Sequence, residues 1–287
     1  MAAYLSWGLF PVYFKAIASV PPIQALAHRV VWSMAFLALL VTAQRRWRGL
    51  AREFSWRRIG IYAATTLLIS ANWLLFIWAV SAGRVLESSL GYFINPLVSV
   101  LLGALFLHER LSARQRVAVA LAAAGVAALV ARLGTFPWVS ILLAVTFGLY
   151  GLLRKQARFD SILGLLVETT LLTPIAGAYL ASLASRGPGA FGGSPSNALL
   201  LIGLGIITPL PLIWFAVGVR SLRLATMGVL QYLAPSGQFV LAVALYREPF
   251  TRAHAVAFAC IWASLALYTS DALRMLRPAP AEPVPLD

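Results

Sequence analysis

The chain has 287 residues, of which 61% are hydrophobic and 11% are charged, and its mean hydropathy is +0.84. A soluble domain of this length cannot bury so much apolar surface, so the composition predicts a polytopic membrane protein. The net charge of +14 does not indicate a nucleic-acid partner, because the basic residues lie in short segments between apolar runs. The single cysteine, Cys260, excludes an internal disulfide framework and a cysteine-rich metal site.

The hydropathy pattern predicts an all-α fold of ten transmembrane helices joined by short connections. In chain order, the predicted helices cover residues 2–18, 25–43, 59–80, 88–107, 117–133, 137–153, 161–180, 198–219, 225–246 and 253–272. Residues 185–197 are rich in Gly, Pro and Ser, which predicts a flexible loop. Residues 274–287 form a Pro-rich tail for which we expect disorder.

The basic residues predict the orientation of these helices. Sixteen Lys and Arg residues lie in segments on the side of the N-terminus, and five lie in segments on the opposite side. Because cytoplasmic segments carry the excess of Lys and Arg, both termini are predicted to be cytoplasmic.

An internal repeat relates the two halves of the chain. Pro96 and Glu109 have counterparts in Pro235 and Glu248 at the same separation, and Ser112 pairs with Thr251 by the same offset. A nearly equal offset pairs Gly8 with Gly148 and Lys15 with Lys155. We therefore predict a first repeat over residues 1–134 and a second over 135–273. Five helices per repeat is an odd number, so the repeats have inverted topology, with a substrate site near the midplane where they meet.

Two proline-containing helices are predicted to converge on that site. Pro96 and Pro235 are predicted helix breaks, because a proline in a membrane helix leaves a backbone carbonyl without its donor. The neutral polar residues beside them occupy matching places in the repeats and are candidates for substrate contact: Tyr92, Asn95, Gln231 and Tyr232. The alternative is that they are hydrogen-bonded between helices and only hold the bundle together.

Glu168 is the sharpest single candidate for chemistry. It lies about eight residues into a predicted span, which is on the order of 12 Å from the membrane edge. Buried ionisable residues at such depth mark transport pathways or proton relays. We interpret Glu168 as a proton-coupling group or a contact for a cationic substrate group. The alternative is a structural glutamate that is hydrogen-bonded to a neighbouring helix.

Three further residues are candidates for lining the substrate site. Arg29 lies near the outer end of the second span and either extends its charge to the interface or holds an anionic group in the cavity. Asn72 and Trp73 precede an aromatic segment at membrane depth. By contrast, Glu109 and Glu248 end corresponding helices, where a carboxylate opposes the helix macrodipole, and we interpret them as gate elements.

Catalytic signatures are absent from the sequence. It contains no Walker A sequence, no His-Glu-x-x-His and no Gly-x-Ser-x-Gly. We therefore predict no catalytic residue, no cofactor and no metal site, and transport would be driven by gradients. A membrane enzyme acting on lipid would need a nucleophile–base pair or metal cluster, which the spans lack. A non-transporting scaffold or regulator is the remaining alternative.

Several motifs resemble the RarD group of the EamA family, within the drug/metabolite transporter superfamily. The motifs are Asn-Trp-Leu-Leu-Phe-Ile-Trp-Ala-Val at 72–80, Leu-Glu-Ser-Ser-Leu-Gly-Tyr-Phe-Ile-Asn-Pro-Leu-Val at 86–98, His-Arg-Val-Val-Trp-Ser at 28–33, Tyr-Gly-Leu-Leu-Arg-Lys at 150–155, Glu-Thr-Thr-Leu-Leu-Thr-Pro at 168–174 and Leu-Arg-Leu-Ala-Thr-Met-Gly-Val-Leu-Gln-Tyr at 222–232. The resemblance covers nearly the whole chain.

This resemblance implies ten helices in two inverted repeats and a permease in the bacterial inner membrane. Proteins of this group are described as chloramphenicol-sensitivity or chloramphenicol-resistance permeases, and the superfamily moves many small molecules. The expected partners are therefore a small-molecule substrate and the lipid bilayer, while the substrate, direction, coupling ion and oligomeric state stay open. Two features depart from the pattern. Relatives carry several more residues before the first helix, which leaves the completeness of the N-terminus open. The ninth helix ends in Arg247-Glu248, where Gly-Glu is commoner.

Overall fold

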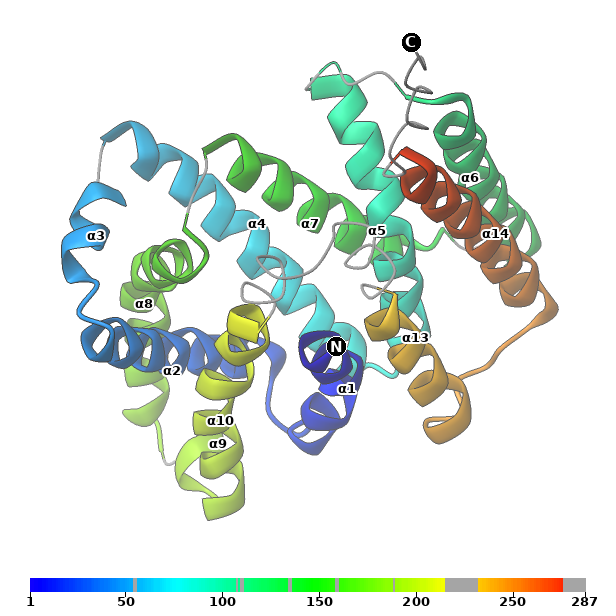
Figure 1. Cartoon of the computed structure of the whole chain (residues 1–287). Coiled ribbons are helices and arrows are strands. Elements are labelled where there is room, and N and C mark those ends of the chain that lie inside the picture. The colour runs from blue at the N-terminus through cyan, green and yellow to red at the C-terminus, as the bar shows by residue number, and fades with distance from the viewer. Residues whose placement is uncertain are drawn as a thin grey trace, which may run out of the picture.

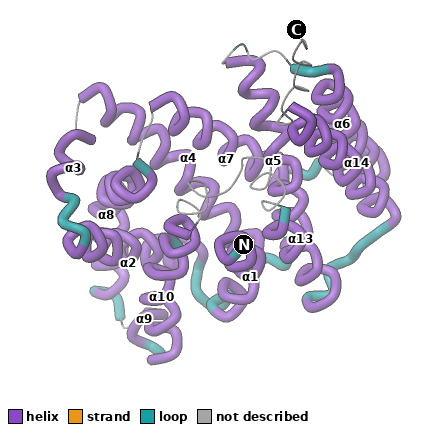
Figure 2. The backbone as a smooth tube through the Cα atoms, viewed as in Figure 1, coloured by secondary structure: helices purple, strands orange, loops and turns teal. Residues whose placement is uncertain are grey.

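The computed structural model describes residues 1–53, 56–106, 108, 111–133, 136–157, 160–187, 189–214 and 232–275. Within these ranges the regular structure is entirely helical, and no strand occurs (Figures 1 and 2). The helices are α1 (Ala2–Ala16), α2 (Pro22–Ala43), α3 (Trp47–Glu53), α4 (Trp56–Ser81), α5 (Val85–Phe106), α6 (Ala113–Leu133), α7 (Trp138–Ala157), α8 (Ser161–Ala184), α9 (Gly189–Gly192), α10 (Pro195–Ile207), α13 (Leu233–Val240), the π-helix η1 (Leu241–Leu245) and α14 (Arg252–Met275).

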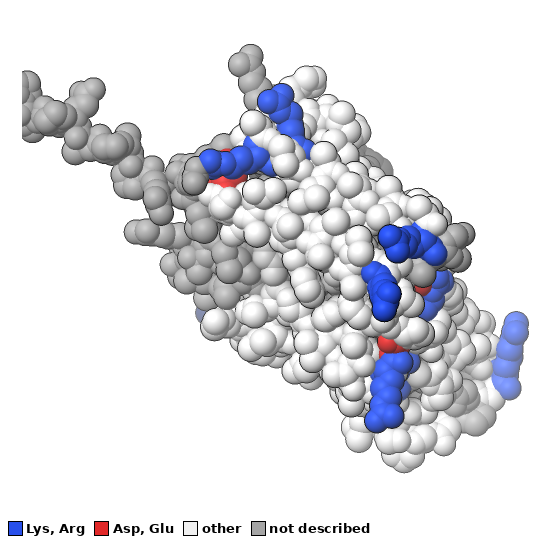
Figure 3. Space-filling view, turned by 90° about the vertical axis from the view of Figure 1, so that its right-hand side faces the viewer, with Lys and Arg blue, Asp and Glu red and all other residues white. Residues whose placement is uncertain are grey.

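Seven of the described helical segments are long and apolar enough to cross a membrane. They are Pro22–Ala43, Arg58–Ser81, Val85–Phe106, Ala113–Arg132, Ile162–Ala184, Pro195–Trp214 and Arg252–Asp271. Two shorter apolar segments, Trp138–Arg154 and Leu233–Leu245, accompany them. One face of the molecule is correspondingly mostly uncharged, with Lys and Arg in a few separate groups (Figure 3). Length and composition therefore identify a multi-pass membrane protein.

The helices form two groups joined through α4 and α7. Helices α2, α8 and α10 pack together in one group, and α6 packs along α14 in the other (Figure 1). Helix α5 contacts α7 and α13, and α13 in turn contacts α1, so segments from the two ends of the chain lie side by side. The main core of buried apolar residues runs through both groups.

Small residues allow the central helices to approach closely. Gly8 of α1 lies against α13, where a Cβ on Gly8 would be 3.5 Å from the Cα of Gly237. Gly91 of α5 lies against α7, where a Cβ would be 2.8 Å from the carbonyl oxygen of Ser140. Apolar burial does not distinguish protein from lipid, so this close packing is a main source of helix association in the membrane.

Two helices begin with the same side-chain arrangement. Before α6, Ser112 Oγ accepts from the Gln115 amide, and Gln115 Oε1 accepts from the Ser112 amide. Before α14, Thr251 Oγ1 accepts from the His254 amide, and His254 Nδ1 accepts from the Thr251 amide. Each is a capping box that satisfies two amide donors at a helix start.

Two helix ends also share one backbone conformation. His108, just past α5, and Arg247, just past η1, have φ of 54° and 53°, in the left-handed region that non-glycine residues rarely adopt. At the second site the Glu248 amide donates to the carbonyl of Ala242, six residues earlier. The bond spans one residue more than in a Schellman motif, as expected where the last turn is the wider π-helix η1.

Some sequence-based expectations about the helices were wrong. The segment predicted as a flexible loop, 185–197, contains α9, and α10 already begins at Pro195, a favourable first helical residue. The basic segment after α2 contains α3, which was not predicted.

The predicted break at Pro96 was also wrong, because α5 runs through this proline without interruption. A proline removes one helix hydrogen bond, and neighbouring helices can stabilise a membrane helix around that defect. Pro235 lies in the first turn of α13, where the missing N–H costs little. The irregular backbone follows later, in η1.

Candidate functional site

Glu168 lies at the centre of a buried polar cluster between α7 and α8. Its side chain is 1% exposed, and Oε2 accepts hydrogen bonds from Tyr150 Oη and Arg154 Nη1, both at 3.1 Å. Arg154 Nη1 also donates to Tyr150 Oη at 2.7 Å, and Arg154 Nη2 donates to the carbonyl of Asp160. Gly164 leaves space for the guanidinium, since a Cβ there would be 2.7 Å from Arg154 Nη2. The cluster therefore combines a carboxylate, its counter-ion and a phenol.

The second carboxylate oxygen of Glu168 has a different environment. Oε1 is buried and has no hydrogen bond of normal geometry to the described residues, although the Thr65 hydroxyl of α4 is close enough to the Glu168 carboxylate to interact with it. Glu168 also lines a small cavity of about 10 Å³, together with Thr66, Ser70 and Trp73 of α4. That volume is close to the minimum for one water molecule, and the lining supplies hydroxyl groups. The cavity therefore has room for about one water molecule beside the Glu168 side chain.

Arg29 of α2 is the second buried ionisable residue of this region. It is 4% exposed, and its guanidinium carbon lies 4.1 Å from the ring centre of Trp73 and 5.7 Å from that of Phe14. Trp73 therefore contacts Arg29 and also lines the cavity beside Glu168. Helix α4 thus connects two of the predicted site residues, Arg29 and Glu168, through Trp73.

Tyr92 lies next to Arg29 in an aromatic group. Its ring centre is 5.8 Å from that of Phe76 and 6.4 Å from that of Phe147, and Phe76 is 5.7 Å from Phe14. Tyr92 is close enough to Arg29 for the two side chains to interact electrostatically. It therefore belongs with Arg29 and Trp73 in one neighbourhood.

The predicted amide residues occupy different positions. Asn72 Nδ2 donates to the carbonyl of Leu143 and to Thr146 Oγ1, so it links α4 to α7. Asn95 lies beside Gly148 of α7, and its buried Oδ1 has no partner within the described ranges. Tyr232 immediately precedes α13 and packs against the main core. Gln231 lies outside the described residues.

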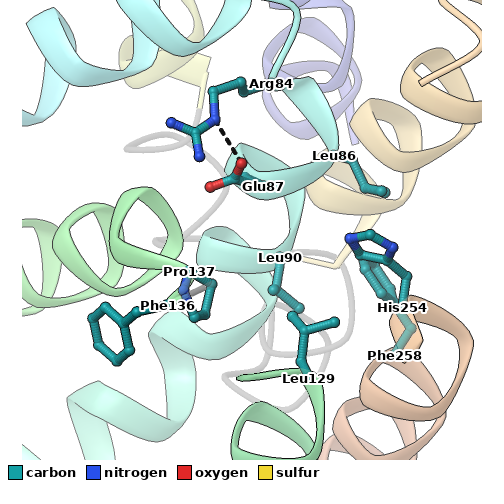
Figure 4. A pocket seen from close by; sticks show the side chains of 9 residues that line it. All are labelled: Arg84, Leu86, Glu87, Leu90, Leu129, Phe136, Pro137, His254 and Phe258. Carbon is teal, nitrogen blue, oxygen red and sulfur yellow. Dashed lines mark hydrogen bonds and ion pairs between the residues drawn. The ribbon is translucent and has the colours of Figure 1, made fainter. Parts of the chain in front are cut away.

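A second cavity, of about 50 Å³, lies near the helix ends formed by α5, α6, α7 and α14 (Figure 4). Arg84 and Glu87 form an ion pair on its wall, with Arg84 Nε 2.6 Å from Glu87 Oε1, and His254 lies on the opposite side. None of the predicted site residues lines it. It is therefore separate from the Glu168 and Arg29 neighbourhood.

The carboxylate of Glu248 caps the start of α5 instead of opposing the end of its own helix. Its two oxygens accept hydrogen bonds from the amides of Val85 and Leu86, both at 2.7 Å. An anion at a helix N-terminus is favourable, so the expected conflict with the macrodipole was wrong for this residue. Burial raises the pKa of this carboxyl above its ordinary value, and the two amide hydrogen bonds oppose the rise. Glu109 lies outside the described residues.

Asp160 holds the start of α8, the helix that carries Glu168. Its Oδ1 accepts from the amides of Ile162 and Leu163, and its Oδ2 forms an ion pair with Arg46 at 2.9 Å. Burial alone would raise the pKa of Asp160, but the hydrogen bonds from Leu163 and Arg46 outweigh it and hold the pKa below its ordinary value.

The lowered pKa predicts how stability depends on pH. Stabilisation by Asp160 is complete above the unfolded-state pKa of about 3.9 and is lost as the pH falls through the lower folded-state value. We expect Asp160→Ala to cost about 0.5–2 kcal/mol at neutral pH, and Asp160→Asn to cost less because asparagine also caps helices. Thermal unfolding in detergent between neutral pH and pH 3 measures both effects. An acid-induced loss that is equally steep in wild type and Asp160→Asn would contradict this account.

Tyr150 and Arg154 are the site residues that sequence reasoning missed. They are four residues apart on α7, so their side chains share one face of the helix. Both fall within the segment 150–155 that resembles the family pattern. The available signal was therefore a tyrosine–arginine pair at helical spacing near the end of an apolar span.

Comparisons with known proteins show the family to which the chain belongs. Residues 1–131 match the EamA-like transporter family. An uncharacterized transporter of Pseudomonas aeruginosa is 45% identical over 98% of this chain and 95% of its own length. The protein RarD of Escherichia coli is 42% identical over 95% of this chain and 93% of its own. A solved crystal structure with 23% identity has a TM-score of 0.60 and covers 96% of both chains, which indicates a shared fold.

Proposed function

Because the chain belongs to the EamA-like transporter family, we propose that it is a secondary transporter of small metabolites or drug-like compounds. We further propose that it works as an exporter in the bacterial inner membrane and that proton movement through Glu168 drives it. The observation that carries this proposal is the buried Glu168 carboxylate, whose Oε2 is paired with Tyr150 and Arg154 and whose side chain lines a small cavity.

The proposed architecture is ten helices in two inverted five-helix repeats with both termini in the cytoplasm. Residues separated by the offset of 139 support it: the capping boxes begin at Ser112 and Thr251, and the left-handed residues are His108 and Arg247. The helix contacts support it too. In the two proposed repeats, α1, α2, α4 and α5 correspond to α7, α8, α10 and α13. Under this correspondence, the α1–α13 contact is equivalent to the α7–α5 contact, and the α2–α10 contact is equivalent to the α8–α4 contact.

The proposed coupling mechanism follows from the bonds around Glu168. The ionised carboxylate holds Arg154 and Tyr150, and thereby ties α7 to α8. Protonation removes the negative charge and weakens the ion pair, because a neutral acid attracts the guanidinium far less. The tie between the two helices then loosens, and the two protonation states favour different packings of the second repeat. Alternating access results when each packing opens the substrate site to one side.

Transport in proteoliposomes tests this function. We expect flux of a radiolabelled substrate found by screening to increase with an imposed proton gradient. Glu168→Gln should abolish the response to the gradient but allow exchange of substrate across the membrane, and Tyr92→Ala should weaken substrate binding. Glu87→Gln is the matched control, since this glutamate forms an ion pair with Arg84 away from the site.

Flux that is insensitive to Glu168→Gln, Tyr92→Ala and collapse of the gradient would remove this mechanism. The alternative of a non-transporting scaffold predicts that cysteines placed at positions 95 and 231 stay inaccessible to water-soluble reagents in every condition. Labelling that changes with substrate would instead favour a transport cycle.

A further inference from the structure

Arg29 is a buried cation for which the protein provides no anion. No hydrogen bond or ion pair joins it to any of the described residues, and its Nε is a buried donor without a partner. The five carboxylates with described side chains are engaged elsewhere: Glu87 with Arg84, Asp160 with Arg46, Glu168 with Arg154, Glu248 with the start of α5, and Asp271 with Ser112 and Arg114. The other four acidic residues of the sequence lie outside the predicted apolar spans.

The internal repeat allows Arg29 to be compared with an equivalent residue that does have a counter-ion. Arg29 lies seven residues after Pro22, which begins α2, and Glu168 lies seven residues after Ser161, which begins α8. The two buried ionisable groups therefore occupy equivalent positions on α2 and α8, which pack against each other.

Their neighbours from the preceding helices differ. The offset of 140 that relates Lys15 to Lys155 also relates Phe14 to Arg154. In the second repeat this position supplies the counter-ion of Glu168, whereas in the first it places the Phe14 ring 5.7 Å from the Arg29 guanidinium. An aromatic face stabilises a cation, but it neither neutralises the charge nor accepts the guanidinium hydrogen bonds as a carboxylate does.

A buried guanidinium without an anion is costly in a membrane protein, and such residues mark substrate or ion pathways. We propose that Arg29 is the anion-recognition group of the transport site, so that the transported compounds are organic anions, carboxylates above all. This inference rests on the proposed transport function and narrows its substrate class. The planar guanidinium can bind a carboxylate through two parallel hydrogen bonds.

The surroundings of Arg29 also indicate the rest of the substrate. Trp73 and Phe14 lie against its guanidinium, and the Phe14–Phe76–Tyr92 chain of ring contacts continues from there. These faces favour an apolar or aromatic body attached to the anionic group. The site therefore fits a small aromatic or aliphatic acid better than a strongly hydrated inorganic anion.

Ligand-induced thermal stabilisation of the full-length protein in detergent tests the proposal without requiring flux. The probes are phenylacetate and phenylacetamide, which have the same shape and differ in charge, with phenylphosphonate and acetate as further arms. We expect phenylacetate to stabilise the wild type at concentrations about tenfold or more below those needed for phenylacetamide, as for a charge-assisted hydrogen bond. Acetate should be weak because it lacks the ring.

Variants at position 29 then assign the effect. Arg29→Gln should remove the preference for acid over amide, and Arg29→Lys should retain part of it because the charge stays while the paired hydrogen bonds are lost. Without ligand, we expect Arg29→Gln to melt no lower than the wild type, because it removes an unneutralised buried charge. A purely structural arginine would instead lose stability on substitution.

Several results would overturn the inference: equal stabilisation of the wild type by phenylacetate and phenylacetamide, or an acid preference that survives in Arg29→Gln. If Arg29→Gln does not fold, an undiminished acid preference in Arg29→Lys has the same meaning. Flux of neutral compounds with no acid preference would refute the anion site and leave the transporter assignment standing. An Arg29-dependent acid preference without flux of any compound would refute the transporter assignment and leave the anion site standing.

Discussion

Replacing Glu168 with leucine should destabilise the protein by about 3–5 kcal/mol, which is typical when one member of a buried ion pair is removed. The Arg154 side chain is 15% exposed, and its Nη1 would lose the only charged group that neutralises it in the described structure. Tyr150 Oη would lose its acceptor as well. Unfolding in mixed micelles with increasing SDS, followed by tryptophan fluorescence, measures the change in free energy.

The double variant Glu168→Leu/Arg154→Met provides the control for this effect. It removes both charges and fills the space with apolar side chains, so we expect it to recover most of the lost stability. A double variant that is as unstable as the sum of its single variants would show that the pair is not energetically coupled. Because glutamine still accepts a hydrogen bond from Arg154, Glu168→Gln should be milder and remains suitable for transport assays.

Replacing Gly205 with alanine should separate α10 from α2 and destabilise the protein by about 1–3 kcal/mol, as expected for overpacking of a tight contact. A Cβ at this position would lie 2.5 Å from the carbonyl oxygen of Trp32 and 2.6 Å from its carbonyl carbon. These atoms belong to the backbone of α2, so no side-chain rotation relieves the clash. Arg29 lies one turn before Trp32 on the same helix, so ligand binding at the site should weaken together with stability.

Gly177→Ala is the matched control, because this glycine is also helical and a Cβ there meets nothing within 4 Å. We expect it to leave the midpoint of SDS unfolding nearly unchanged. If the two alanine variants have the same stability, close packing between α2 and α10 does not contribute to the fold. We expect Gly205→Leu to prevent folding, because its side chain is larger than that of alanine. A stable Gly205→Leu variant would contradict the prediction in the same way.

Local features of the fold could be predicted because they depend on short stretches of sequence. The apolar spans, the pairing of Ser112 with Thr251 and the burial of Glu168 all followed from hydropathy and spacing. The Gly-Glu pair that the family resemblance implies at Arg247 has a local explanation too, because the φ of 53° at this position lies in the region that glycine adopts most readily.

The partners of the polar groups could not be predicted in the same way. Glu168 pairs with a residue fourteen positions away, and Glu248 caps a helix start 162 and 163 residues away. Nothing in the hydropathy of either segment specifies such a partner, because lipid and protein surfaces are equally apolar to a membrane helix. Pro96 shows the same limit, since the proline alone predicted a break and α5 continues through it.

By itself, the sequence determined the protein class, the helical content and the two ionisable residues placed within apolar segments. Those properties arise from transfer free energies and hydrogen bonds that act within one or two helical turns. The tertiary structure alone decided that Glu168 has a counter-ion and that Arg29 has aromatic rings in its place. The physical reason is that charge neutralisation in a dry interior depends on which helix faces pack together, and that packing is a property of the whole bundle.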